Sequence, residues 1–166
     1  MCNVYFISDL HLKHKHICRF SPNRLGVTLD DPDVHDALLL LSIKSRVTKR
    51  DVLWILGDVA FTDEGLELLK DLPCKLMLVR GNHDELPTAR YLEVFDEVFG
   101  LVNKYGFWLS HAPIHPDELR GKKNIHGHVH NAVIPDNRYI SVCVEALEGR
   151  PISLQELRQQ QRLLHG

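Results

Sequence analysis

Residues 52–58 read Val-Leu-Trp-Ile-Leu-Gly-Asp: five consecutive apolar side chains, then a glycine and a carboxylate. A short apolar run of this kind is typical of a buried strand in a parallel sheet. The glycine permits a sharp turn and a close approach of backbone where the strand ends. Ligands of such sheets bind outside the carboxyl ends of the strands. The segment therefore predicts a buried strand that ends at a functional residue, Asp58.

The same pattern, an apolar strand followed by a metal-competent residue, occurs four more times along the chain. The additional strands are expected at Val4–Ile7, Leu76–Val79, Phe107–Leu109 and Lys123–Ile125. With Asp58, the polar residues at or just after these strand ends are Asp9, His11, Asn82, His83, Asp84, His111, His128 and His130. Because the carboxyl ends of the strands share one crevice, we expect these side chains to gather there.

Helical patterns separate the strands of the first half of the chain. We expect helices at 32–47, 63–71, 87–94 and 153–164, the first begun by Asp31-Pro32 and the last by the capping box Ser153–Glu156. In the first of these, Val34, Ala37, Leu38 and Leu41 share one face. Strand–helix alternation predicts a parallel α/β arrangement. The second half, with further strands at 97–102, 106–109 and 139–144, is compatible with an antiparallel arrangement.

Composition narrows the class of protein. With 166 residues, 44% of them apolar and 25% charged, the chain predicts one globular domain over residues 1–166. A net charge of −2 argues against a dedicated duplex nucleic-acid binder, and no apolar run approaches the length of a membrane span. The four cysteines are widely spaced, which favours reduced thiols and a cytoplasmic location. A monomer and a homodimer are both compatible with these features.

The donor set itself indicates metal chemistry. It offers carboxylate and amide oxygens and imidazole nitrogens but no thiolate, which suits Mn²⁺ above all, with Fe, Zn²⁺ or Ni²⁺ as alternatives. Seven donors are too many for one tetrahedral zinc ion, so we expect two divalent metal ions that share a carboxylate. Such a pair activates a hydroxide for attack on phosphorus and clamps the phosphoryl oxygens.

The complete set of motifs resembles the calcineurin-like metallophosphoesterase superfamily. The motifs are Asp9-x-His11, Gly57-Asp58, Gly81-Asn82-His83-Asp84, His111 and Gly127-His128-x-His130, in the order found in that family. The short chain and its Leu12–Phe20 stretch are similar to small single-domain bacterial and phage members. The resemblance implies a two-sheet αββα sandwich with a dinuclear metal site at one rim.

The resemblance also implies a role for each motif residue. One metal would be held by Asp9, His11 and His130, the other by Asn82, His111 and His128, with Asp58 bridging the two. His83 would contact the phosphoryl group and protonate the leaving oxygen. Asp84 would orient His83 and keep it cationic. Taken singly, each motif could be ordinary turn chemistry, but five such coincidences at successive strand ends are not expected.

Other residues are assigned less directly. Lys13–Arg24 is expected to be a basic loop that is either a solvated charge run or a wall facing the substrate. Within it, Arg24 is the preferred phosphate contact, because guanidinium pairs bidentately with phosphate, and His14 is a second candidate. His35, His115 and His165 are expected on the surface, and His126 is expected to pack at a strand end.

These features together predict a metal-dependent phosphoesterase whose partner is a small phosphorylated substrate. Small phosphodiesters, such as nucleotides or cyclic nucleotides, are slightly preferred, because the chain is too short to carry a cap domain over the site. Two alternatives use the same site: a phosphomonoesterase and a nucleoside-polyphosphate hydrolase. A third is a non-catalytic interaction scaffold on the same fold, although every ligand position and His83 are present.

Overall fold

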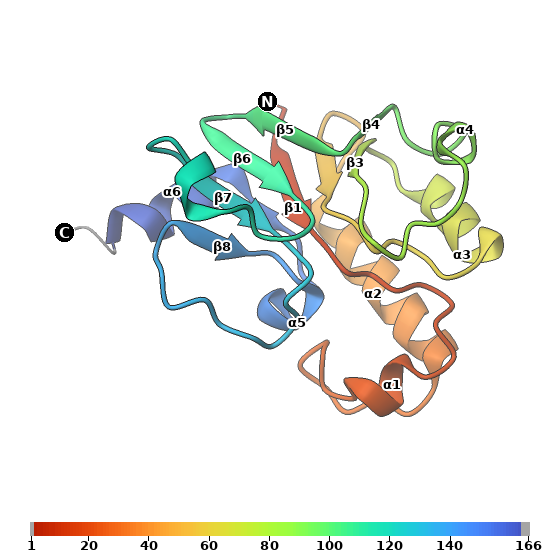
Figure 1. Cartoon of the computed structure of the whole chain (residues 1–166). Helices are drawn as coiled ribbons and strands as arrows, with labels where there is room; N and C mark the ends of the chain where they lie inside the picture. The colour runs from red at the N-terminus through yellow and green to blue at the C-terminus, as the bar shows by residue number, and fades with distance from the viewer. Residues whose placement is uncertain (1, 164–166) are drawn as a thin grey trace.

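The computed structural model describes residues 2–163, which form two packed β-sheets with helices around them (Figure 1). The first sheet has the strand order β4-β3-β2-β1-β9. Its strands are β1 (Val4–Ile7), β2 (Val52–Ile55), β3 (Lys75–Val79), β4 (Glu97–Phe99) and β9 (Ile152–Ser153). The strands β1 to β4 are parallel and β9 is antiparallel to β1, so the predicted parallel arrangement of the first half is confirmed.

The second sheet has the order β5-β6-β7-β8. Its strands are β5 (Leu101–Lys104), β6 (Phe107–Ser110), β7 (Lys123–His126) and β8 (Tyr139–Ser141). Only the β5–β6 pair is antiparallel, whereas β6, β7 and β8 are mutually parallel. The antiparallel expectation is therefore wrong for most of this sheet, because long crossovers rather than hairpins join β6 to β7 and β7 to β8.

One predicted strand is in fact two. The expected strand at 97–102 is interrupted at Gly100, where the chain leaves the first sheet and enters the second. The residues on either side pair with different neighbours: Phe99 with Val79 of β3, and Leu101 with Ser110 of β6. A continuous apolar pattern does not reveal such a change of sheet, because both halves have the same local conformation.

Alternation of side chains along the strands builds a core on each face of the first sheet. Phe6, Trp54 and Met77 point toward the second sheet and pack with its inner residues, which include Leu109 and Ile125. The side chains that alternate with these along the strands, such as Ile7, Leu53 and Leu78, pack on the opposite face against α2 (Pro32–Arg46), α3 (Asp63–Glu67) and the segment that follows α3. On the outer side of the second sheet, Trp108 donates its indole N–H to the carbonyl of Leu119, so the segment carrying η2 (Pro116–Glu118) covers it. The two-sheet sandwich is as predicted.

Helices form at the four predicted positions with shorter or divided bounds, and three helical turns form where none was predicted, one of them in place of the end of the strand expected at 139–144. They are α1 (Ile17–Phe20), α2 (Pro32–Arg46), α3 (Asp63–Glu67), η1 (Leu68–Asp71), α4 (Thr88–Tyr91), η2 (Pro116–Glu118), α5 (Val144–Leu147) and α6 (Leu154–Leu163). The predicted loop at 13–24 thus contains a helical turn, α1, beside α2. The capping box is confirmed, with Ser153 and Glu156 each accepting the other's backbone N–H. Within residues 2–163, no helix is both long and apolar enough to cross a membrane.

The face that α2 buries differs from the sequence expectation. Val34, Leu38 and Leu41 are exposed, whereas His35 and Asp36 are buried with the apolar side chains of the helix. The Asp36 carboxylate accepts the backbone N–H of Lys13, and its other oxygen lies 2.9 Å from His35 Nδ1. His35 is therefore not the surface residue that was expected, because this polar pair holds the chain after β1 against the helix.

Asp51 fixes where the first two strands begin. Its buried carboxylate accepts the backbone N–H of Asn3 at 2.8 Å and both the N–H and the hydroxyl of Thr48, each at 2.8 Å. We expect Asp51→Asn to lower the free energy of unfolding at pH 7 by about 1–3 kcal/mol, since an amide cannot accept all three hydrogen bonds. Urea unfolding of the two proteins measures this loss, with the exposed Asp30→Asn as the control.

The same pair of proteins tests the pH dependence. Burial alone raises the pKa of Asp51, but the donated hydrogen bonds outweigh it and hold the pKa below its usual range. A carboxylate whose pKa is lowered by folding stabilises the protein above its unfolded pKa of about 3.9, and loses this contribution as the pH falls through its folded pKa. The stability difference between wild type and Asp51→Asn should therefore shrink below about pH 4. An unchanged difference at pH 3 and pH 7 contradicts this assignment.

Candidate metal centre

The seven predicted ligands meet at one rim of the sandwich, where strands of both sheets end. Asp9, His11, Asp58 and Asn82 follow β1, β2 and β3 of the first sheet, and His111, His128 and His130 follow β6 and β7 of the second. The turns after β1 and β2 are joined by backbone hydrogen bonds, from Asp9 N to the Gly57 carbonyl and from His11 N to the Asp58 carbonyl, both at 3.0 Å.

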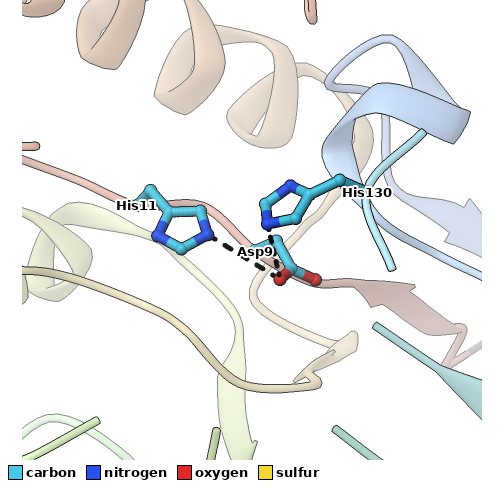
Figure 2. Close-up of side chains that lie close together, drawn as sticks. All are labelled: Asp9, His11 and His130. Carbon is cyan, nitrogen blue, oxygen red and sulfur yellow. Dashed lines mark ion pairs between the residues drawn. The ribbon is translucent and has the colours of Figure 1, made fainter. Parts of the chain in front are cut away.

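Asp9, His11 and His130 form the first group of donors (Figure 2). The Nε2 atoms of His11 and His130 lie 3.7 and 3.8 Å from the same oxygen of Asp9, Oδ1. The two imidazole rings stack with their centroids 5.2 Å apart. All three ligand atoms lie within 4.8 Å of one another, so a single ion could bind all three.

Asp58, His111 and His128 form the second group. His111 Nε2 lies at its centre: 3.3 Å from Asp58 Oδ2, 3.2 Å from His128 Nδ1 and 2.9 Å from Asn82 Oδ1. Asp58 Oδ2 is also 3.8 Å from His11 Nε2 of the first group. One carboxylate oxygen therefore faces both groups, which is the position that a bridging ligand requires.

The backbone is strained at the ligand positions. Five of the seven residues have the positive φ that non-glycine residues rarely adopt, between 49° and 72°; they are Asp9, His11, Asp58, His128 and His130. Each such residue costs of order 1–3 kcal/mol and persists only where the surrounding structure enforces it. These strained conformations lower the stability of the fold. They also direct the five side chains toward one point.

Glycines make room for this convergence. Gly57 has φ of 89°, and a Cβ there would lie 2.4 Å from His111 Nδ1. A Cβ on Gly127 would lie 2.4 Å from Asp9 Oδ2. Contacts this short would push the ligands apart, so we attribute both glycines to the close approach of turns from the two sheets.

Unpartnered atoms show that the donors suit a cation. Asp9 Oδ2 accepts hydrogen bonds from the Ser8 hydroxyl at 2.6 Å and from His128 N at 2.9 Å. Asp9 Oδ1 and His11 Nε2, in contrast, are buried and make no hydrogen bond. Buried polar atoms are nearly always partnered, so two that face each other without a donor between them fit a site for a cation.

The charges at the centre agree with this assignment. Burial raises the pKa of Asp9 and of Asp58, but imidazole and N–H neighbours outweigh burial and hold both pKa values below the usual range. His111 Nδ1 lies 2.7 Å from the carbonyl of Leu56, to which it can donate, and this leaves Nε2 as the lone-pair nitrogen facing the second group. The rim therefore combines two carboxylates with imidazole nitrogens, a set that suits divalent metals.

Behind the first group lies a carboxylate that motif reasoning missed, Glu145. Its buried Oε1 is 3.0 Å from His130 Nδ1 and 3.1 Å from Arg24 Nε. A carboxylate that accepts from the outer nitrogen of a metal-binding histidine fixes the ring and increases its basicity. Glu145 follows the apolar residues 142–144, so it continues the strand-end pattern beyond the last motif used to find the site.

Arg24 does not contact the substrate side, and its prediction as a phosphate ligand is wrong. Its side chain is 0% exposed, because it pairs with Glu145 and donates to the backbone carbonyl of Asp9. The guanidinium therefore ties the turn after β1 to the carboxylate behind His130. It thereby positions candidate ligands from the two sheets.

Asp84 also has a role other than the one expected. Its two oxygens accept the backbone N–H groups of Asp58, Val59 and Gly81 at 2.7–2.9 Å, rather than orienting the ring of His83. The carboxylate thus fixes the turn that carries Asp58. His83 itself is exposed beside the centre, where its backbone N–H donates to Asp58 Oδ1 at 2.9 Å.

A cleft of about 380 Å³ opens beside the first group. Its walls include His11, His14, Phe20, Phe61, His83 and His130. Burial and the neighbouring His11 lower the pKa of His14, so His14 faces the cleft as a neutral ring. His14 and His83 are thus placed where a molecule bound at the rim would reach them.

Two other predicted histidines belong to neither donor group. His126 is buried where β7 ends, as expected for a packing residue, and His115 is exposed. The prediction for His165 lies outside the described residues.

Comparison with known proteins agrees with the fold and the donor set. The family model of the calcineurin-like phosphoesterases matches residues 2–158. The Gene 66 protein of Mycobacterium phage L5 is 32% identical, covering 95% of this chain and 93% of its own length. An uncharacterized protein of Methanocaldococcus jannaschii is 29% identical over 93% of this chain and 88% of its own. A solved structure of a protein of unknown function from Aquifex aeolicus superimposes with a TM-score of 0.76 at 26% identity, covering 96% of this chain and all of that one.

The chain therefore belongs to the calcineurin-like phosphoesterase family. Membership and the two groups of candidate ligands together support a metal-dependent phosphoesterase.

Glu145 can be tested through metal affinity. We expect Glu145→Gln to weaken binding of Mn²⁺ by about 10–100-fold, because His130 loses the charged acceptor that orients it. Isothermal titration of metal-depleted protein measures the affinity, and Glu148→Gln, a nearby exposed glutamate, is the matched control. Unchanged affinity in Glu145→Gln, with the control also unchanged, contradicts the positioning role.

Proposed function

We propose that the protein hydrolyses small phosphodiesters, such as nucleotides or cyclic nucleotides, with two bound divalent metal ions, Mn²⁺ being preferred over Fe, Zn²⁺ and Ni²⁺. The observation that carries this proposal is the placement of Asp58 Oδ2, which faces both donor groups at 3.3 and 3.8 Å. When bound, such a metal pair supplies an activated nucleophile and neutralises the charge of the phosphoryl oxygens.

Residues of the chain itself would hold the metals and supply a proton. Asp9, His11 and His130 would hold one ion, and Asn82, His111 and His128 would hold the other, with Asp58 placed to face both. His83 is the proposed general acid: it lies in the cleft wall, with its ring centroid 5.9 Å from that of His11, and its protonated ring would donate a proton to the leaving oxygen and become neutral.

The size and charge of the protein support a small substrate. A cleft of about 380 Å³ accommodates a small molecule, and a net charge of −2 does not favour a duplex nucleic acid. The free cysteines are consistent with a cytoplasmic enzyme, which we propose acts as a monomer or a homodimer.

The proposal is tested by hydrolysis of bis(p-nitrophenyl) phosphate and p-nitrophenyl phosphate after chelation and again after Mn²⁺ is restored. We expect turnover to vanish with chelation and return with metal, faster for the diester. Faster turnover of the monoester favours a phosphomonoesterase instead. Absence of turnover in protein that binds no metal favours a non-catalytic scaffold.

Asp58→Asn should reduce both metal content and activity. Removing the shared negative charge weakens both donor groups, so we expect kcat to fall by roughly 100-fold or more. Elemental analysis of the purified variant should find fewer than two metal ions per chain. Full occupancy by two ions would show that Asp58 does not bridge the groups.

His83→Ala should separate catalysis from metal binding. We expect the variant to keep both metals, because His83 belongs to neither donor group. Turnover of methyl phenyl phosphate should fall about 10²–10⁴-fold, whereas bis(p-nitrophenyl) phosphate, whose leaving group needs no proton, should be affected far less. Equal effects on both substrates would refute the general-acid role, and loss of metal would refute the ligand assignment.

A further inference from the structure

We propose that Phe20 and Phe61 form a platform that binds a planar aromatic group, such as a nucleobase, carried by the phosphate compound at the metal centre. This inference rests on the proposed function and identifies the part of the substrate that lies beyond the phosphate. Both rings line the cleft that opens beside His11 and His130.

The exposure of these two rings is the first observation. Phe20 is 70% exposed and Phe61 is 43% exposed, whereas Phe6, Tyr91 and Phe95 are buried in the core. A single exposed apolar residue is ordinary, but two phenyl rings on one cleft beside a polar centre form an apolar surface that water solvates poorly. Such a surface is typical of a ligand site with few polar groups.

The second observation is that other rings hold the platform in place. The ring of His14 packs edge-on against Phe61, with centroids 4.4 Å apart and planes at 88°, and against Phe20, at 5.8 Å and 70°. Edge-to-face pairs of this kind are favourable. His14 thus contacts both phenyl rings and holds them on one wall of the cleft.

Phe61 also connects the platform to the reaction centre. Its ring centroid lies 5.4 Å from that of His11, a candidate metal ligand, and 5.2 Å from that of His83, the proposed acid. A group resting on Phe61 would therefore lie beside the reaction centre, within reach of a phosphate bound there.

The charge of the cleft also restricts the kind of compound that it can bind. Its lining includes histidines, one buried glutamate and apolar residues, and within the described part of the chain no lysine or arginine lines it. Additional phosphates would need such cations, so the cleft suits an uncharged ring on a single phosphate better than a polyphosphate. A volume of about 380 Å³ is in the range of small-ligand sites.

The test compares three phosphonates that cannot be hydrolysed: methylphosphonate, cyclohexylmethylphosphonate and benzylphosphonate. Isothermal titration into the Mn²⁺-loaded protein should find benzylphosphonate about tenfold tighter than methylphosphonate, the gain expected for one stacked ring. Cyclohexylmethylphosphonate, apolar but not planar, should bind clearly more weakly than benzylphosphonate. Equal affinity for all three, or a tighter cyclohexyl compound, overturns the proposal.

Variants test whether the tighter binding of benzylphosphonate depends on the two phenyl rings. Phe61→Ala and Phe20→Ala should each reduce the benzyl preference, and the double variant should bring it to within about twofold. Phe61→Tyr should retain the preference, and Leu101→Ala, an exposed apolar residue on β5, is the matched control. A preference that survives the double substitution places the aromatic group elsewhere and overturns the proposal.

Turnover of methyl p-nitrophenyl phosphate, measured on the same samples, separates this inference from the proposed function. Metal-dependent turnover without a benzyl preference leaves the phosphoesterase intact and refutes the platform. A benzyl preference that depends on Phe20 and Phe61, without turnover, supports the platform and refutes the proposed catalytic activity.

Discussion

The whole arrangement depends on the contact between the strand ends of the two sheets. The hydrogen bond from His128 N to Asp9 Oδ2 crosses this boundary, and the contact between His111 Nδ1 and the carbonyl of Leu56 crosses it again. Both contacts need Gly57 and Gly127 to carry no side chain. Each donor group draws residues from both sheets, so neither sheet alone contains a complete ligand set. The two donor groups can therefore form only when the two sheets pack against each other.

Much of this could be predicted from the sequence because the informative residues lie directly after apolar strands. Parallel strands place their carboxyl ends at one edge, so the order Asp9, Asp58, Asn82 along the chain becomes proximity in space. The capping box at Ser153 and the N-cap at Asp31 were equally readable, since each acts within four residues. Patterns that act within a few residues, or that repeat at strand ends, therefore predict the structure well.

The direction in which a side chain points could not be predicted from the sequence. Arg24 has the right chemistry for phosphate, but the loop turns it inward to Glu145. Asp84 is adjacent to His83 in sequence, yet its oxygens face the backbone of the neighbouring turn. On α2, an apolar stripe that looks like a buried face is exposed, because the pair His35–Asp36 makes the polar contacts that the chain after β1 requires. In each case the sequence shows which residue is present, but tertiary contacts determine where its side chain points.

The division of each ligand group between the two sheets has a consequence for synthesis of the chain. The first sheet's donors, from Asp9 to Asn82, emerge from the ribosome long before their counterparts. The second group becomes complete only at His128 and the first only at His130, two residues apart. A nascent chain therefore completes neither candidate donor group before residue 128 has been made. Any metal that these groups bind would therefore be captured after the two layers assemble, and both groups are completed at nearly the same point of translation.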